Sequence, residues 1–239
     1  MSNSMRPLPL NRIPWSRPSW LRPKYLLFAV IGVMFVIVAI VFERFLIDYK
    51  DPEWKHIEPF KWWLLVHGIA GASALILGPM QFSDRLRQRF TKLHRVVGRI
   101  YVTSALIAAP MGAYIEYVQE RTGATRSFTI ETVLQGGLWF LTTAIAFAFI
   151  LNGKVQQHRA WMIRSFATGP MIFLEVRVIM WLIGIQNLTP SKVETIVWLC
   201  TASSIFLADV VLQIQEYLRS RPAAANLPLV SQTRNTARL

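Results

Sequence analysis

Six long apolar segments constrain what this 239-residue chain can fold into more than any other feature of its sequence. They run approximately over residues 25–47, 62–82, 96–118, 130–151, 163–185 and 195–218. Each segment is long enough to cross the hydrocarbon core of a bilayer, which takes about 20 residues of helix. A helix also satisfies its own backbone hydrogen bonds in lipid, where water is absent. We therefore predict an all-α, polytopic transmembrane bundle of six spans that occupies residues 25–218.

The basic residues indicate how these spans are oriented. Most of the 26 Lys and Arg residues lie in residues 1–24, 83–99, 152–164 and 219–239, which alternate with loops that carry fewer of them. Under the positive-inside rule, this distribution predicts that both termini are cytoplasmic. We expect a multi-pass protein of the bacterial inner membrane, in contact with membrane lipid. The net charge of +13 then reflects topology rather than nucleic-acid binding, because the chain has no polar domain large enough to hold a duplex.

The two ends of the chain differ from the membrane domain in composition. Residues 1–24 interleave proline with arginine and tryptophan, and the prolines prevent a regular helix. We interpret this segment as a basic arm on the lipid surface, or alternatively as a plain disordered leader. Residues 219–239 are predicted to be a disordered cytoplasmic tail.

Two similar phrases, LHRVVGR at residues 93–99 and QHRAWMIR at 157–164, open the third and fifth spans. Both spans run outward from the cytoplasm, so His94 and His158 begin their helices at one level. If the helices are neighbours, the two imidazoles could ligate one haem b. Arginine suits bidentate binding of carboxylates, and the candidate propionate ligands are Arg95, Arg99, Arg159 and Arg164. The alternatives are that these clusters bind an anionic headgroup or solute, or that they only anchor the helix ends.

Three ionisable residues share a depth in the outer part of the predicted bundle. At about 1.5 Å of rise per residue, His67 on the second span lies level with Glu175 and Arg177 on the fifth. Ionisable groups inside a bilayer are costly and usually pair within the bundle. At least one of Glu175 and Arg177 should find its partner on another helix, and His67 is a candidate partner for Glu175. The three residues would then form an outer ligand or proton site.

Other residues in the spans predict close packing and local breaks. Asp209 lies in the cytoplasmic third of the sixth span, level with Arg99 or Arg164, and Gln81 lies near the cytoplasmic end of the second. Small residues at 68, 71, 72 and 74 smooth the second span for a neighbouring helix or a flat ligand. The internal prolines Pro79, Pro110 and Pro170 free backbone groups that a partner must satisfy.

Three ordered phrases, at residues 67–82, 93–101 and 158–165, carry a resemblance to a known family. They read HGIAGASALILGPMQF, LHRVVGRIY and HRAWMIRS. Over roughly residues 60–185 the chain resembles bacterial membrane proteins catalogued as domain-of-unknown-function family 2306 (DUF2306). It is more loosely similar to the four-helix b-type cytochromes, a likeness that implies haem-linked electron transfer.

These observations support three hypotheses of function, and whether the chain is an enzyme stays open. The first is b-type haem or quinone-linked electron transfer, with His94 and His158 as iron ligands and a redox partner. The second is non-redox binding or transport of a small anion or lipid headgroup, which the proline-broken spans and intramembrane charges favour. The third is a structural or assembly subunit whose polar residues only hold helices together.

Overall fold

The computed structural model describes residues 23–42, 48, 50 and 53–220, and every regular element in this part of the chain is helical. The elements are α1 (Pro23–Val41), α2 (Glu53–Ile57), the 3-10 turn η3 (Glu58–Phe60), α3 (Lys61–Gln81), α4 (Asp84–Arg89), α5 (Thr91–Glu120), α6 (Arg126–Leu151), α7 (Val155–Phe166), the π-helical turn η4 (Ala167–Met171), α8 (Ile172–Ile183), the 3-10 turn η5 (Ile185–Asn187) and α9 (Pro190–Ser220). The predicted N-terminal arm and C-terminal tail lie almost wholly outside the described residues.

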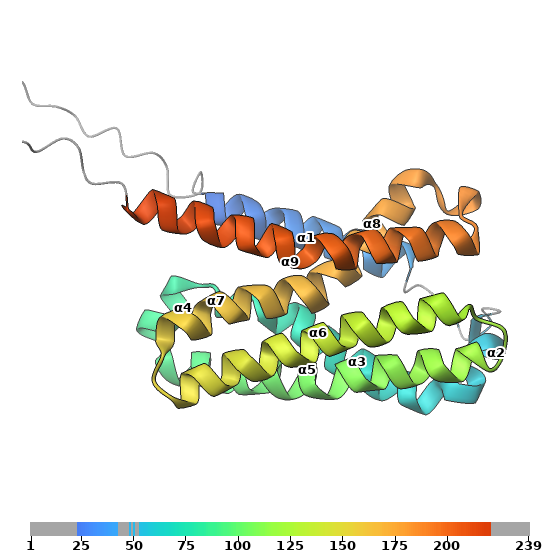
Figure 1. Ribbon diagram of the computed structural model, residues 1–239, viewed down its shortest axis with the longest axis horizontal. Helices are drawn as coiled ribbons and strands as arrows, with labels where there is room; N and C mark the ends of the chain where they lie inside the picture. Colours follow the sequence, from blue (N-terminus) through green and yellow to red (C-terminus); the bar gives the residue numbers. More distant parts are fainter. Residues whose placement is uncertain (1–22, 43–47, 49, 51–52, 221–239) are drawn as a thin grey trace, which may run out of the picture.

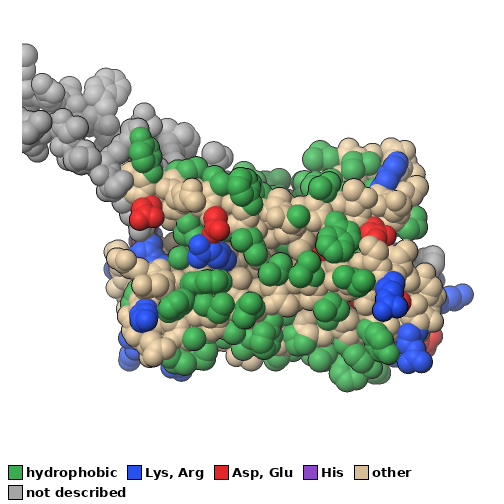
Figure 2. All heavy atoms as spheres, viewed as in Figure 1, with side chains coloured by type: hydrophobic (Ala, Val, Ile, Leu, Met, Phe, Trp, Pro, Cys, Tyr) green, Lys and Arg blue, Asp and Glu red, His purple; other side chains and the backbone are tan. Residues whose placement is uncertain are grey.

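Five helical stretches in the described part of the chain are long and apolar enough to cross a membrane. They are Glu58–Gln81, Thr91–Glu120, Arg126–Leu151, Val155–Ile183 and Pro190–Tyr217. The predicted first span corresponds to α1, whose apolar stretch Ala29–Val41 is shorter, and residues 43–47 lie outside the described part. Hydrophobic side chains cover the sides of the bundle, whereas charged side chains gather mostly toward its two ends (Figure 2). The all-α prediction is confirmed, and the sixth span stays a prediction.

The helices that follow one another in the chain also pack on one another. Contacts join α3 to α5, α5 to α6 and α6 to α7, while α9 contacts α8, α7 and α6, and α1 contacts α8. In Figure 1 the start of α1, the end of α9, α4 and the α6–α7 turn all lie at the left end of the bundle. We name this the inner end, and the opposite end, with α2 and the α5–α6 turn, the outer end.

Small side chains bring α3 and α5 close together. Ala74 on α3 and Ala105 and Ala108 on α5 are fully buried in the main core. Without bulky side chains between them, the two backbones can approach closely, which is the usual basis of helix association in lipid. Only part of the predicted smooth surface of α3 packs against another helix, because Gly68 and Gly71 have open space around them.

The predicted break at Pro170 is confirmed, and it separates α7 from α8. Proline cannot donate a backbone hydrogen bond, and the wider π-helical turn η4 accommodates it. The side-chain amide of Gln135 on α6 donates to the Thr168 carbonyl in this turn at 2.7 Å. A partner on a neighbouring helix therefore satisfies the irregular backbone. Pro79 and Pro110, in contrast, lie inside continuous helices α3 and α5.

Candidate functional site

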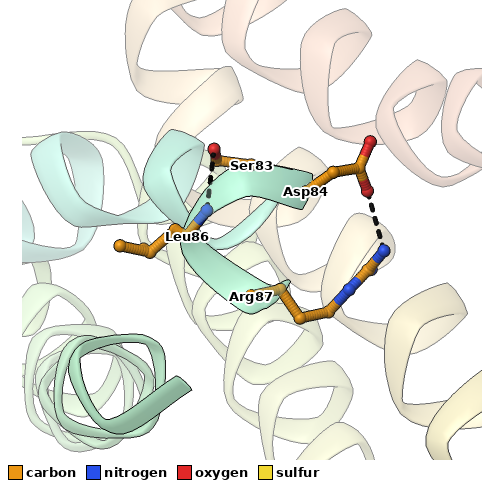
Figure 3. Close-up of polar contacts among 4 residues, drawn as sticks. All are labelled: Ser83, Asp84, Leu86 and Arg87. Carbon is orange, nitrogen blue, oxygen red and sulfur yellow. Dashed lines mark hydrogen bonds and ion pairs between the residues drawn. The ribbon is translucent and has the colours of Figure 1, made fainter. Parts of the chain in front are cut away.

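The short helix α4 positions the inner ends of α3 and α5. Ser83 caps it by accepting a hydrogen bond from the Leu86 backbone N–H at 3.4 Å, and Arg87 donates to Asp84 at 2.7 Å (Figure 3). These local contacts stabilise a single turn and a half of helix that reverses the chain direction. The turn leaves Gln81, at the end of α3, facing the first turns of α5.

Gln81 lies against the face of α5 that also carries His94. A Cβ atom added to Gly98 would lie 3.1 Å from the Gln81 side-chain oxygen, so the amide rests against Gly98. His94 is four residues earlier on the same helix and therefore shares that face. The Gln81 Nε2 and His94 Nδ1 atoms are both buried, and no described residue offers either atom a hydrogen-bond partner. Two unsatisfied polar atoms thus lie at the inner end of the bundle.

His158 is held in a defined orientation by the neighbouring helix. Its Nδ1 lies 2.8 Å from the carbonyl oxygen of Ala146 on α6. Because a carbonyl only accepts, Nδ1 is the donor, and Nε2 is not used in this contact. His94 lies within electrostatic range of His158, Arg87 and Arg95. The structure therefore brings together the two histidines that the repeated phrases single out, at the inner end of the bundle.

The four predicted propionate-binding arginines differ in their surroundings. Arg164 forms an ion pair with Asp209 on α9, with Nε and Nη2 each 2.8 Å from one carboxylate oxygen. Its guanidinium also lies over the Trp161 ring, 4.9 Å from the centroid. The expected pairing of Asp209 with an arginine is confirmed. The Arg164 guanidinium already binds this carboxylate. Arg95, Arg99 and Arg159 are exposed. We call Gln81, His94, His158, Arg164 and Asp209 the inner cluster.

A buried hydroxyl network, which no pattern in the sequence indicates, fills the middle of the bundle. The Tyr101 hydroxyl lies 2.9 Å from Ser165 Oγ, which lies 2.6 Å from Thr143 Oγ1. Thr143 in turn donates to the Trp139 carbonyl at 2.7 Å. All three hydroxyl-bearing residues are fully buried. The donors can run in one direction from α5 through α7 to α6, so the network fixes these three helices against one another.

His67 at the outer end has a different partner from the one expected. Its Nδ1 lies 2.9 Å from the carbonyl oxygen of Ala108 on α5, and its ring packs against Gly112. The candidate His67–Glu175 pair does not form among the described residues, where the imidazole hydrogen-bonds to α5 instead. Arg177 lies within electrostatic range of His67 and packs over the Phe173 ring, 3.7 Å from its centroid. His67 and Arg177 thus share a depth as predicted, but the backbone holds the histidine.

Two further carboxylates, neither of them predicted from the sequence, lie in this outer region. Glu131 on α6 is 1% exposed and accepts a hydrogen bond from Thr201 on α9 at 2.5 Å. Glu116 on α5 lies within electrostatic range of Glu131, and one of its oxygens is buried without a partner among the described residues. Their position inside the third and fourth apolar segments is a signal that could have identified them. We call His67, Glu116, Glu131, Glu175 and Arg177 the outer cluster.

The donor set at each end limits what it can hold. Among the described residues, no group of three or more His, Cys, Asp or Glu side chains is arranged to bind a metal ion. His158 fits a haem ligand, because ligating histidines usually donate the other ring N–H to a carbonyl. His94 fits less well, because its buried Nδ1 has no carbonyl or carboxylate partner among the described residues. Its unsatisfied Nδ1 and the Gln81 amide fit a ligand that supplies hydrogen-bonding atoms.

The long apolar helices, with charged side chains mostly toward the two ends of the bundle, define a polytopic α-helical membrane protein. A family model described as "Predicted membrane protein (DUF2306)" matches residues 64–212, well over half of the chain. The chain belongs to the DUF2306 family. The match extends beyond the 60–185 region in which the resemblance was first seen, and so takes in most of α9 with Asp209.

No curated protein and no solved structure matches the chain. The looser likeness to b-type cytochromes accordingly gains no support from these comparisons, and the roles of the inner histidines rest on the geometry alone.

Proposed function

We propose that this chain is a quinone-linked redox protein of the bacterial inner membrane that binds a quinone headgroup in the inner cluster. The observation that carries the proposal is the pair of buried polar atoms, His94 Nδ1 and Gln81 Nε2, that lack partners among the described residues. A buried polar group without a hydrogen bond costs about 1–3 kcal/mol. A ligand with two acceptor oxygens would remove that cost at both atoms.

A quinone matches this requirement in three respects. Its two carbonyl oxygens accept hydrogen bonds from an imidazole N–H and an amide N–H. It is apolar and dissolves in the bilayer, which is where the ends of α3 and α5 place these groups. Its oxygens become more negative on reduction, and the cationic surroundings of His94, with Arg87 and Arg95 in electrostatic range, favour added negative charge. His94 is also placed to exchange a proton with the headgroup.

The orientation of the chain agrees with a cytoplasmic site. With both termini cytoplasmic, as the basic loops favour, the inner cluster faces the side on which soluble electron donors are found. Reduction of a quinone to a quinol needs two electrons and two protons. The electrons would come from a partner redox protein, and the imidazole of His94 would pass protons at its ring nitrogen.

Binding of a short-chain quinone to the purified protein tests this proposal. Calorimetric titration should give a Kd that rises about fivefold to tenfold for Gln81→Leu, because one neutral hydrogen bond contributes about 1 kcal/mol. Gln88→Leu is the matched control, since Gln88 is exposed on the neighbouring helix α4. Equal affinity in wild type and Gln81→Leu, or no binding by the wild type, would refute the proposal.

Thermal stability distinguishes this site from a structural role of the same residues. Without quinone, Gln81→Leu removes an unsatisfied buried amide and should leave the melting temperature unchanged or raise it. With quinone present, only the wild type and the control should be stabilised, since ligand binding to the native state raises stability by mass action. A large loss of stability without quinone would instead assign Gln81 to packing.

Haem b is the second candidate, and the orientation of His158 favours it. With Nδ1 on the Ala146 carbonyl, Nε2 is free to ligate iron, and the exposed Arg95, Arg99 and Arg159 could reach propionates. When bound, haem would supply one-electron chemistry. Protein expressed with added haem should then show a Soret band that disappears in both His94→Ala and His158→Ala. A colourless wild type that still binds quinone would exclude this alternative.

A further inference from the structure

A groove runs along the outside of the bundle between α3 and α5. Its volume is about 510 Å³. Small residues form its floor, including Ala70 and Ser73 of α3 and Ser104 of α5. Its walls are the exposed side chains Ile69 and Ile107. The groove exists because the close-packed face of these two helices is flanked by large aliphatic side chains that project past it.

One hydroxyl group on the floor of this groove is already hydrogen-bonded within its own helix. The Ser73 hydroxyl donates to the Ile69 carbonyl one turn earlier at 2.7 Å, so its proton is already used within α3. Along α5 the groove extends from Arg99 to Ile107, which corresponds to about 12 Å of helix. A surface of this kind suits a narrow, flexible hydrocarbon chain.

One end of the groove carries a positive charge. Arg99 lines it, is exposed, and forms no hydrogen bond or ion pair with another residue of the described part of the chain. It lies eight residues into α5, about 12 Å from the inner end of that helix. A long arginine side chain at this depth can extend its guanidinium to the headgroup level while its stem stays in the hydrocarbon. A guanidinium in that position is suited to a phosphate.

We propose that this α3–α5 groove binds an anionic phospholipid, with one acyl chain along the floor and the phosphate on Arg99. Charge complementarity selects the occupant: the groove is apolar along its length and cationic at the end nearest the headgroups. The groove lies on the lateral surface of the bundle, whereas the inner cluster lies between the helices. The lipid proposal therefore does not depend on quinone binding.

Native mass spectrometry of the purified full-length chain, mixed with phosphatidylglycerol or phosphatidylcholine of equal chain length, tests the proposal. The wild type should retain phosphatidylglycerol about fivefold better, since one Lys or Arg near an anionic lipid surface contributes about 1 kcal/mol. Arg99→Gln should abolish this preference. Arg85→Gln is the matched control, because Arg85 is an exposed arginine of α4 outside the groove. The proposal is overturned if both variants lose the preference equally.

A second variant separates binding in the groove from general attraction to charge. Thr103 is an exposed residue that lines the groove, so Thr103→Phe should fill it without disturbing the core. Retention of both lipids should fall in this variant while the melting temperature is unchanged. If the wild type is instead a dimer that Thr103→Phe converts to a monomer, a second copy of the chain occupies the groove and the lipid proposal is wrong.

Discussion

Gly78 offers a sharp test of how α3 packs in the bundle. A Cβ atom at this position would lie 2.5 Å from two ring carbons of Phe166 and 3.2 Å from a ring carbon of Tyr101. Phe166 cannot easily move away, because it is buried and packs edge-on against Phe82 at a centroid distance of 5.5 Å. Gly78→Ala should therefore destabilise the protein, even though alanine is the better helix former.

The expected magnitude follows from two opposing effects. Inserting a methyl group into a filled core costs about 1–3 kcal/mol. The gain in helix propensity from glycine to alanine is at most about 1 kcal/mol. Gly71→Ala is the matched control in the same helix, because no atom lies within 4 Å of its added Cβ and only the propensity gain applies. The two variants should differ by about 2 kcal/mol, or roughly 4–8 °C in melting temperature for a protein of this size.

The assay can use the single cysteine of the chain. Cys200 is buried on α9, so a thiol-reactive fluorophore reports unfolding of the solubilised full-length protein. Gly78→Ala should melt below the wild type, and Gly71→Ala at or above it. The double variant Gly78→Ala/Phe166→Leu should lose less stability than the sum of its single changes, because the smaller side chain removes the clash. Equal melting temperatures for the two alanine variants would refute the described packing of α3 against α7.

Two further predictions concern contacts between distant helices. A double-mutant cycle of Arg164→Ala and Asp209→Ala can be measured by the same thiol assay. The coupling free energy should be about 1 kcal/mol, because the ion pair is partly exposed. Additive losses of stability would argue against the ion pair. Gln135→Leu should cost about 1–3 kcal/mol, because it leaves the Thr168 carbonyl of the π-helical turn unsatisfied, and an unchanged melting temperature would contradict that contact.

The sequence predicts depth along each helix better than it predicts which side chains meet. Asp209 and Arg164 illustrate the success: both depths follow from residue rise, and the pair forms. His67 and Glu175 illustrate the failure, because residues at one depth can still face different neighbours. Only the packing order of the helices decides that His67 reaches the Ala108 carbonyl of α5. The rotation of each helix about its axis is set by the bundle and not by its own apolar pattern.

The beginnings of the helices differ from the apolar pattern for a related reason. The third and fifth apolar segments begin at residues 96 and 163, yet α5 begins at Thr91 and α7 at Val155. Helix formation depends on backbone hydrogen bonds, which continue through polar residues at the membrane boundary. His94 and His158 consequently lie inside regular helices, where their orientation is fixed. The partner of Glu131, in contrast, could not be predicted from local sequence, because Thr201 lies 70 residues away on α9.

The contrast between the buried hydroxyl network and the inner cluster supports the proposed quinone site. Tyr101, Ser165 and Thr143 are fully buried, and their hydroxyl groups find partners within the bundle. Gln81 and His94 are only partly buried, yet each keeps one buried atom without a partner among the described residues, as Glu116 does in the outer cluster. That cost is difficult to explain by packing, because apolar side chains of similar size would avoid it. Unsatisfied hydrogen-bonding atoms beside cationic side chains suit a ligand that accepts hydrogen bonds, and the proposed quinone site rests on this arrangement.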